Sequence, residues 1–293
     1  MDVAQKALTR VAPRWAAALI ACALLCTGSA APAAAPMRVV SVVPAVTEML
    51  FAIGAGPQVV GVSSFDHFPV EVEKLPRVGG LIDPDVERIL TLAPDLVIVY
   101  GAKSDLAARL SRAKIATFPY ESGTLANVTG TIRALGERLG RQAGADAEAT
   151  RIERGLAAIR ARVAGLPRLR TLLIFGRERG SLRGVYASGG VGFLHDLLDI
   201  AGGDDVFAEV KRENVQVSAE QMLARAPEAI VELHGAMTPQ LFAIERSVWT
   251  QLPGLPAVKN HRVYLLADEM LTIPGPRVVE AAKMMADALH PLK

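Results

Sequence analysis

The stretch "DVERILTLAPDLVIV" (residues 85–99) is nearly repeated as "SAEQMLARAPEAIVE" (residues 218–232). In both stretches a glutamate precedes a proline at the same spacing, Glu87 before Pro94 and Glu220 before Pro227. Each stretch predicts a short helix that ends before the proline and is followed by a buried strand. The preceding helix also ends alike in the two halves, as "FAIGAG" (51–56) and "LDIAGG" (198–203). Two similar α/β lobes explain this repetition better than chance does.

Strands and helices alternate on both sides of this repeat. We expect a first helix with Thr47 as N-cap and Gly54 or Gly56 at its end. The other predicted helices cover 85–92, 104–113, 124–141, 193–203, 218–225 and 276–289, and the predicted strands cover 38–43, 59–64, 95–100, 115–120, 171–176, 228–233 and 262–267. Such alternation is typical of parallel sheets covered on both faces. The predicted fold class is therefore α/β, with two similar Rossmann-like lobes.

A long helix is predicted between the lobes. The stretch "ADAEATRIERGLAAIRARVA" (145–164) lacks proline and carries one apolar stripe, formed by Ile152, Leu156, Ile159 and Val163. A helix of this kind is suited to be a rigid connector. We expect an N-terminal lobe at 37–143, the connector at 144–166, a C-terminal lobe at 167–293, and a ligand cleft between the lobes.

The N-terminus is typical of a secretory signal peptide. Three basic residues precede the apolar run "WAAALIACALLC" (15–26), and small residues follow it. We expect residues 1–35 to be removed and the remaining chain to be exported to the periplasm. Because "LIAC" (19–22) also has the order of a lipoprotein cleavage site, lipid anchoring at Cys22 is the less favoured alternative. Both cysteines, Cys22 and Cys26, fall in this segment, so the mature chain would have no disulfide or thiolate metal site.

Composition and motifs argue against two classes of function, nucleic-acid binding and catalysis. The chain has 293 residues, 51% of them hydrophobic, so it can bury a large core. Beyond the signal peptide its basic and acidic residues balance, which argues against nucleic-acid binding. The sequence lacks G-x-S-x-G, H-E-x-x-H and a glycine-rich phosphate loop, so it predicts no enzyme. The alternative from another class is a periplasmic enzyme that uses Glu121 or Glu269 as general base.

Candidate ligand-binding residues follow the ends of the predicted strands, where ligands of parallel α/β sheets bind. His67 and His234 could approach a metal centre, although loop histidines are more often simply solvated. Tyr100 is either a ligand contact or a core residue with its hydroxyl at the edge. Asp66, Arg177, Asp268 and Glu269 could bind amide or carboxylate groups. The full candidate set is Phe65, Asp66, His67, Leu81, Tyr100, Tyr120, Arg177, Asn214, His234, Asp268 and Glu269.

Three stretches together resemble one family. They are "VVSVVPAVTEMLFAIGAGPQVVGVSSFDHFP" (39–69), "DVERILTLAPDLVIVYG" (85–101) and "SAEQMLARAPEAIV" (218–231), with the long helix between the last two. In this order they resemble the helical-backbone class (class III) of periplasmic substrate-binding proteins of ABC importers, and within it the cobalamin-binding members. The resemblance covers residues 37 to 290. It implies a monomeric receptor, without a cofactor of its own, that delivers a metal chelate to a membrane permease dimer.

The resemblance also implies roles for individual residues. In this class one surface glutamate on each lobe pairs with arginines of the permease, and the matching residues are Glu87 and Glu220. The alternative is that both glutamates are present only because acidic residues are favoured at helix N-termini. Positions that pack against the corrin are matched by Phe65, Leu81, Tyr100 and Asn214, of which only two are aromatic. A cobalt corrinoid is the expected ligand, with haem or a ferric siderophore as alternatives.

A haem-binding alternative has its own requirements. Haem receptors of this class place a tyrosine ahead of the docking glutamate, and "VGGLIDPDVE" (78–87) has none. His67 and His234 would then be the axial candidates. No metal site formed by the protein alone is predicted.

Overall fold

The computed structural model describes residues 38–292. The predicted signal peptide and Cys22 lie outside these residues. Within residues 38–292, no helix is long and apolar enough to cross a membrane.

The first lobe is built on a four-stranded parallel sheet. Its strands have the order β2-β1-β3-β4 and all neighbouring pairs are parallel, as predicted. The strands are β1 (Val39–Ser41), β2 (Val59–Val62), β3 (Leu96–Tyr100) and β4 (Ala116–Tyr120). The helices are α2 (Pro44–Ala52), α3 (Val86–Thr91), α4 (Asp105–Arg112) and α5 (Leu125–Leu139), with 3-10 turns at Gly56–Gln58 and Val70–Lys74.

The second lobe is built on a six-stranded mixed sheet. Its order is β10-β9-β5-β6-β8, and β7 also pairs with β5. The strands are β5 (Leu169–Gly176), β6 (Val185–Gly189), β7 (Gly203–Asp205), β8 (Arg212–Val217), β9 (Ala229–His234) and β10 (Val263–Ala267). The helices are α7 (Phe193–Ile200), α8 (Ala219–Arg225), α9 (Pro239–Ser247), α10 (Pro256–Lys259) and α11 (Val278–Leu289), with 3-10 turns at Ala208–Val210, Val248–Gln251 and Glu269–Thr272.

The prediction that both sheets are wholly parallel is wrong for the second lobe. β6 runs antiparallel to β5, and β8 runs antiparallel to β6. The connection from β5 to β6 covers only residues 177–184, which is too short for the helical crossover that a parallel pair needs. The sequence of β6, "VYASG", offers little apolar alternation, so neither antiparallel strand was predicted.

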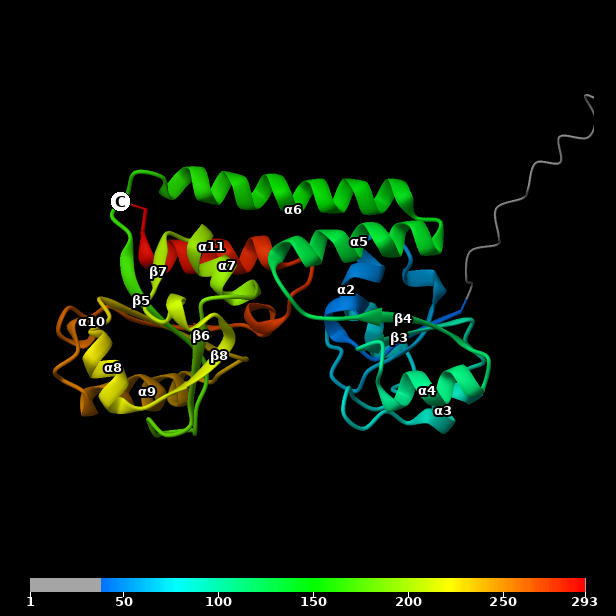
Figure 1. The fold of residues 1–293 in the computed structure, drawn as a ribbon, viewed down its shortest axis with the longest axis horizontal. Helices are drawn as coiled ribbons and strands as arrows, with labels where there is room; N and C mark the ends of the chain where they lie inside the picture. Colours follow the sequence, from blue (N-terminus) through cyan, green and yellow to red (C-terminus); the bar gives the residue numbers. More distant parts are fainter. Residues whose placement is uncertain (1–37, 293) are drawn as a thin grey trace, which may run out of the picture. The chain divides into compact units, whose positions relative to one another are not determined.

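The helix between the lobes, α6 (Gln142–Val163), forms as predicted but begins earlier. Gly140 ends α5 in the left-handed conformation, with φ 67°, so α6 follows almost at once. The residues of the predicted stripe are buried. Figure 1 shows α6 lying over α5 of the first lobe and over α11 and α7 of the second. Thus α6 packs against both lobes.

The first helix begins at Pro44 and not after Thr47. A proline at the first helical position loses no hydrogen bond, because the N–H it lacks would have had no partner in the helix. Thr47 is therefore not the N-cap. Its hydroxyl donates to the carbonyl of Val43 at 3.3 Å.

The repeated stretches fold alike. α3 begins with the Asp85 carboxylate accepting the backbone N–H of Arg88, and α8 begins with the Ser218 hydroxyl accepting that of Gln221. Both helices end at a left-handed alanine, Ala93 with φ 44° and Ala226 with φ 46°. The predicted repeat is therefore a repeat of backbone geometry as well as of sequence.

One buried ion pair joins the lobes directly. Arg277, just before α11, donates through Nη2 to Glu48 Oε1 at 2.6 Å and through Nε to Glu48 Oε2 at 2.9 Å. Glu48 lies on α2 and its side chain is only 3% exposed. Burial raises the pKa of Glu48, although the Arg277 guanidinium opposes this. Such a geometry stabilises two charges that would otherwise be costly to bury.

We predict that Glu48→Gln destabilises the protein by about 3 kcal/mol, because it leaves the Arg277 guanidinium without its compensating charge. Urea unfolding at pH 7 measures this free energy. Glu280→Gln is the matched control, since Glu280 also pairs with an arginine, Arg151 at 3.5 Å, but is half exposed. The control substitution should lower the free energy of unfolding by less than about 1 kcal/mol. Equal losses in the two variants would contradict the role given to Glu48.

Candidate functional site

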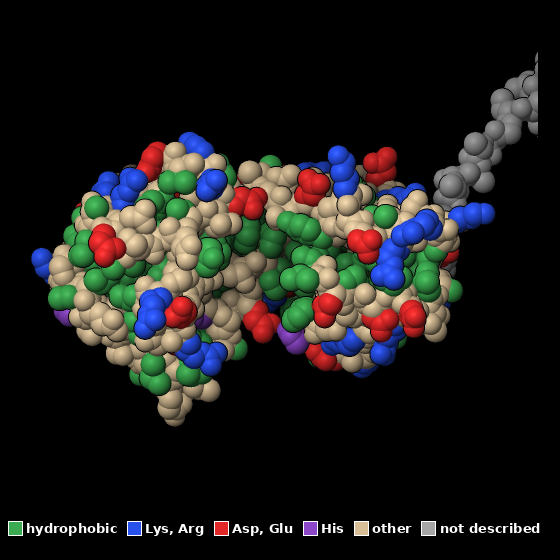
Figure 2. Space-filling view, turned by 60° about the horizontal axis from the view of Figure 1, so that its bottom comes forward, with side chains coloured by type: hydrophobic (Ala, Val, Ile, Leu, Met, Phe, Trp, Pro, Cys, Tyr) green, Lys and Arg blue, Asp and Glu red, His purple; other side chains and the backbone are tan. Residues whose placement is uncertain are grey.

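A cavity of about 200 Å³ is lined by both lobes. The first lobe contributes Ser122 and Gly123, which follow β4. The second lobe contributes Phe175, Val191, Gly192, Phe193, Leu194, Glu213, Asn214 and Thr272. Figure 2 shows the hollow between the lobes, with hydrophobic side chains on both of its sides. The walls thus come from segments far apart in the sequence.

The first lobe carries an exposed apolar rim. Phe65 is 64% exposed, Leu81 44% and the neighbouring Ile82 96%, and Phe68 and Val70 are also exposed. The Phe65 ring lies over Gly80, where an added Cβ would come within 2.6 Å of Phe65 Cε2. Large apolar side chains gathered on a surface indicate a binding site rather than a stable solvent face. Phe65 and Leu81, both predicted ligand contacts, therefore have accessible side chains.

Tyr100 reaches the cavity through Ser122. Its hydroxyl lies 2.9 Å from Ser122 Oγ, and its side chain is 41% exposed. Tyr120 packs edge-on against it, with ring centroids 6.2 Å apart. Tyr120 itself is buried, which raises the pKa of its phenol to about 12. Tyr100 thus stands at the surface with Tyr120 as its support.

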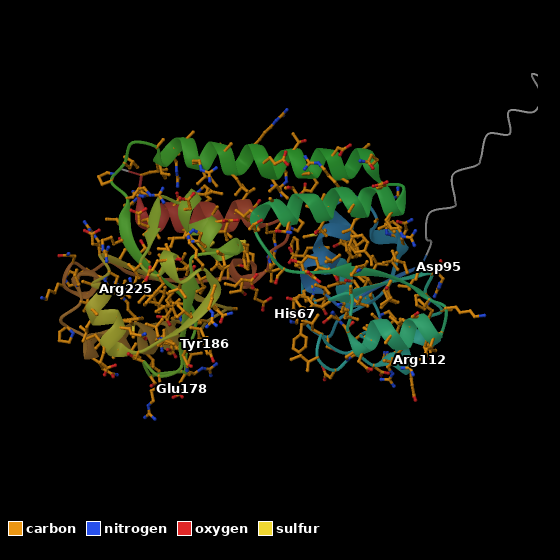
Figure 3. The ribbon with its side chains drawn as sticks, in the orientation of Figure 1. His67, Asp95, Arg112, Glu178, Tyr186 and Arg225 are labelled. Carbon is orange, nitrogen blue, oxygen red and sulfur yellow. The ribbon has the colours of Figure 1, made fainter. Side chains whose placement is uncertain are left out.

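The two polar candidates of the first rim loop lie in opposite environments. Asp66 is only 1% exposed, so it does not line the surface, and the prediction that it contacts a ligand has no support from its position. Burial raises the pKa of Asp66 to about 6, although Thr47, Ser63 and Arg77 act in the other direction. His67 is exposed and lies 3.9 Å from Glu73. Figure 3 places His67 at the edge of the first lobe that faces the second.

The second lobe holds a buried charge cluster beside a further cavity of about 350 Å³, which shares Phe175 with the first. Arg177 contacts Glu232 at 2.6 Å and Glu245 at 2.7 Å, and its side chain is only 2% exposed. Both glutamates and three backbone carbonyls, of Glu178, Ser181 and Glu245, surround the Arg177 guanidinium and leave it little capacity to bind a ligand group. The predicted ligand contact of Arg177 therefore has no support from its ion pairs and stays a prediction. Arg177 holds the wall of the pocket in place.

His234 stands at the open side of this cluster. Its Nε2 lies 3.0 Å from Glu232 Oε1, and Glu232 also accepts the indole N–H of Trp249 at 2.8 Å. Burial would raise the pKa of Glu232, but hydrogen bonds from His234 and Arg177 outweigh it and hold that pKa low.

Sequence reasoning missed Glu232, Glu245 and Trp249. Glu232 sits in the middle of the buried strand "AIVELH", and that position is the one signal that could have revealed it. An acid inside a buried strand needs internal partners. Glu245, on α9, gave no such signal because its helix has charged and apolar residues mixed.

The remaining candidates of the second lobe are accessible to different degrees. Asn214 lines the first cavity, but it lies in β8 and not beyond a strand end. The Asp268 carboxylate accepts the backbone N–H of Met270 at 2.9 Å and lies 3.9 Å from Arg277. Part of its hydrogen-bonding capacity is therefore used within the protein. Glu269 is exposed.

Glu87 and Glu220 lie outside both cavities. Each is exposed on the first turn of its helix, α3 or α8, and neither forms a salt bridge within residues 38–292. The Ser218 hydroxyl lowers the pKa of Glu220. Figure 1 shows α3 in the first lobe and α8 in the second, both on the side away from α6.

Among the described residues, no group of three or more His, Cys, Asp or Glu side chains could hold a metal ion.

A family model described as "Periplasmic binding protein" matches residues 39–270. The chain belongs to this family. One relative, the vitamin B12-binding protein of Salmonella typhimurium (strain LT2), is 32% identical over 258 residues, which cover 87% of this chain and 91% of that protein. The predicted family resemblance is thereby confirmed.

Solved structures confirm the predicted two-lobed α/β fold. The periplasmic vitamin B12-binding protein of Vibrio cholerae has a TM-score of 0.74 at 24% identity, covering 87% of this chain and 96% of that one. The periplasmic haem-binding protein of Roseiflexus sp. RS-1, in its apo form, has a TM-score of 0.72 at 25% identity, covering 86% and 97%. All three similar proteins are named for binding and not for catalysis.

The buried Asp66 predicts a dependence of stability on pH. Its pKa is 3.8 in a model peptide and about 6 in the folded protein, so between these values the folded state holds a proton that the unfolded state has lost. Stability therefore falls as pH rises through this range, and the penalty, roughly 3 kcal/mol, is fully present above pH 6.

Asp66→Asn cannot titrate and should gain stability relative to the wild type at pH 7.5, with the gain shrinking toward pH 4. Urea unfolding across this range measures the difference, and Asp83→Asn, at an exposed aspartate, is the control. A gain for Asp66→Asn that is the same at every pH would contradict the assignment.

Proposed function

We propose that this protein is the substrate-binding protein of an ABC importer, and that it carries a metal chelate, in the first place cobalamin or another corrinoid. The observation that carries the proposal is the cavity lined by both lobes beside an exposed apolar rim. The 32% identity to a protein named for binding vitamin B12 supports the same ligand. In this role the protein acts in the periplasm, as a monomer, and catalyses no reaction.

The chemistry of the walls suits a corrinoid. A corrin has a broad apolar ring and a periphery of amide groups, so a receptor needs apolar contacts for the faces and a few hydrogen-bonding groups for the edge. Phe65, Leu81 and Tyr100 offer the apolar contacts on the first lobe. Ser122 and Asn214, from opposite lobes, line the same cavity and suit amide groups. Glu269 is accessible for a further hydrogen bond.

Haem is the second candidate, because of His234. Metal-binding histidines usually donate their other ring N–H to a carboxylate, which fixes the orientation of the ring. Glu232 stands in that relation to His234. An imidazole so held could take an axial position on haem iron. A ferric siderophore, whose iron is fully coordinated by the siderophore itself, would draw nothing from this arrangement.

Delivery requires a partner, which we propose is a permease dimer in the membrane. Glu87 and Glu220 are equivalent, exposed carboxylates on equivalent helices, one in each lobe. A dimer presents the same basic surface twice, so two equivalent acids match it in number and charge. The ligand-binding walls, in contrast, do not repeat between the lobes.

A panel of chelates tests the ligand. The purified mature protein is mixed with cyanocobalamin, haemin or a ferric hydroxamate, and its melting temperature and absorption spectrum are recorded. We predict the largest stabilisation with cyanocobalamin, about 3 kcal/mol at a hundredfold excess over Kd. A Soret shift with haemin that disappears in His234→Ala would instead favour haem. Turnover of a small substrate without stabilisation by any chelate would favour an enzyme.

The apolar rim has a matched control in the same experiment. Leu81→Ala should weaken binding of the favoured chelate about tenfold, because a leucine side chain contributes ~1.5 kcal/mol or more when it is buried by the ligand. Leu166→Ala removes an equally exposed leucine, 45% against 44%, at the end of α6. Equal effects of the two variants would place the ligand elsewhere.

For the partner, we predict that the double variant Glu87→Ala/Glu220→Ala keeps its chelate affinity and loses delivery. Uptake of labelled ligand into proteoliposomes that contain the importer measures delivery, and calorimetry measures affinity. The difference in delivery between the wild type and this variant should become smaller as the salt concentration is raised, because salt screens exposed charge pairs. A loss of chelate binding in this variant would contradict the docking role.

A further inference from the structure

Each proposed docking glutamate is followed, three positions later, by an exposed leucine. Leu90 follows Glu87 in α3, and Leu223 follows Glu220 in α8. Their exposures are nearly the same, 43% and 45%. In both helices the residue just before the leucine, Ile89 or Met222, is fully buried and supplies the contact with the core. The leucines are therefore not needed to anchor their helices.

The two leucines occupy equivalent positions in space as well as in sequence. Both helices start with a side-chain cap on the third helical residue and end at a left-handed alanine followed by proline. Residues three apart on a helix lie on one side of it. Each helix therefore presents a carboxylate and a leucine as one exposed pair, and the molecule carries this pair twice.

A single exposed leucine needs no explanation, because much of any protein surface is apolar. The presence of the same exposed leucine in both repeated helices does need an explanation. The other residues of the two helices differ, with Arg88 against Gln221 and Thr91 against Ala224, while the glutamate and the leucine are kept together. The basic residue of α8, Arg225, is occupied by Glu209 and by the face of Phe207. What the two helices share on their exposed sides is thus one negative charge and one apolar group, while the exposed Arg88 of α3 has no counterpart in α8.

We propose that Leu90 and Leu223 form the apolar part of the contact with the permease dimer. Each leucine enters an apolar recess next to the basic group that receives the neighbouring glutamate, once on each permease subunit. This inference rests on the proposed function, and it adds a contact that acts by desolvation and not by charge. Interfaces of this kind combine a small apolar centre with charges that set orientation.

The experiment uses the mature full chain and the ABC importers of its own bacterium, each purified in lipid nanodiscs. Wild-type protein is first tested against each importer, and the one that binds is used for the variants. Leu90→Ser/Leu223→Ser should weaken binding at least tenfold while chelate affinity and melting temperature stay unchanged. Leu166→Ser/Ile244→Ser, at two exposed apolar residues outside α3 and α8, should change importer binding less than twofold.

Raising the salt concentration distinguishes the apolar part of the proposed contact from its charged part. The loss in the leucine variant should persist at 0.5 M NaCl, where the loss in the glutamate variant shrinks. The single variants Leu90→Ser and Leu223→Ser should have similar effects, because the proposed recesses are equivalent. A leucine double variant that binds like the wild type, or singles of which only one has an effect, would overturn this inference alone. Failure of the wild type to bind any importer would overturn the proposed function itself.

Discussion

The bidentate pair between Glu48 and Arg277 is the interaction on which the rest of the structure depends. Glu48 belongs to the first helix of the first lobe and Arg277 to the segment that leads into the last helix, so the two ends of the described chain are tied through one buried contact. The same guanidinium lies 4.3 Å from the centre of the Phe68 ring in the first rim loop. The position of the rim is therefore coupled to the contact that joins the lobes. With α6 packed against both lobes, only small relative movements are compatible with this arrangement.

Two arginines, Arg277 with a partly exposed side chain and Arg177 with a buried one, hold the structure around the site in place. Arg277 holds the lobes together, and Arg177 holds the wall of the second-lobe pocket through Glu232 and Glu245. In each case the low-dielectric surroundings make the ion pair strong and the loss of one partner expensive. The first cavity is lined by aromatic, aliphatic and polar side chains, Glu213 among them, which suits a large ligand with apolar faces. The exposed acids of α3 and α8 line neither cavity, so the proposed permease contact would leave the proposed ligand site free.

Much of this could be predicted from the sequence, for identifiable reasons. The repeated helix-strand units carried strong local signals: caps, apolar periodicity and prolines at fixed spacing. The antiparallel strands β6 and β8 were missed because β6, "VYASG", has little apolar alternation and four of the six residues of β8, "RENVQV", are polar or charged. Asp66 and Arg177 were expected at the surface because they follow strand ends, yet a carboxylate can fold under its own loop and an arginine can be drawn inward by acids from distant segments. Such pairings, like Glu48 with Arg277, depend on tertiary contacts that no local pattern encodes.

The proposed function places the ligand between the lobes and leaves the repeated helices free for the permease. Amide hydrogen exchange of the mature protein with and without saturating cyanocobalamin tests it most directly. We predict slower exchange in the first-lobe rim (63–82), around Ser122 and in the cavity segments 191–194 and 212–217, with no change in α3 or α8. Protection of α3 and α8, or an unchanged cavity in a protein that binds the ligand, would contradict it.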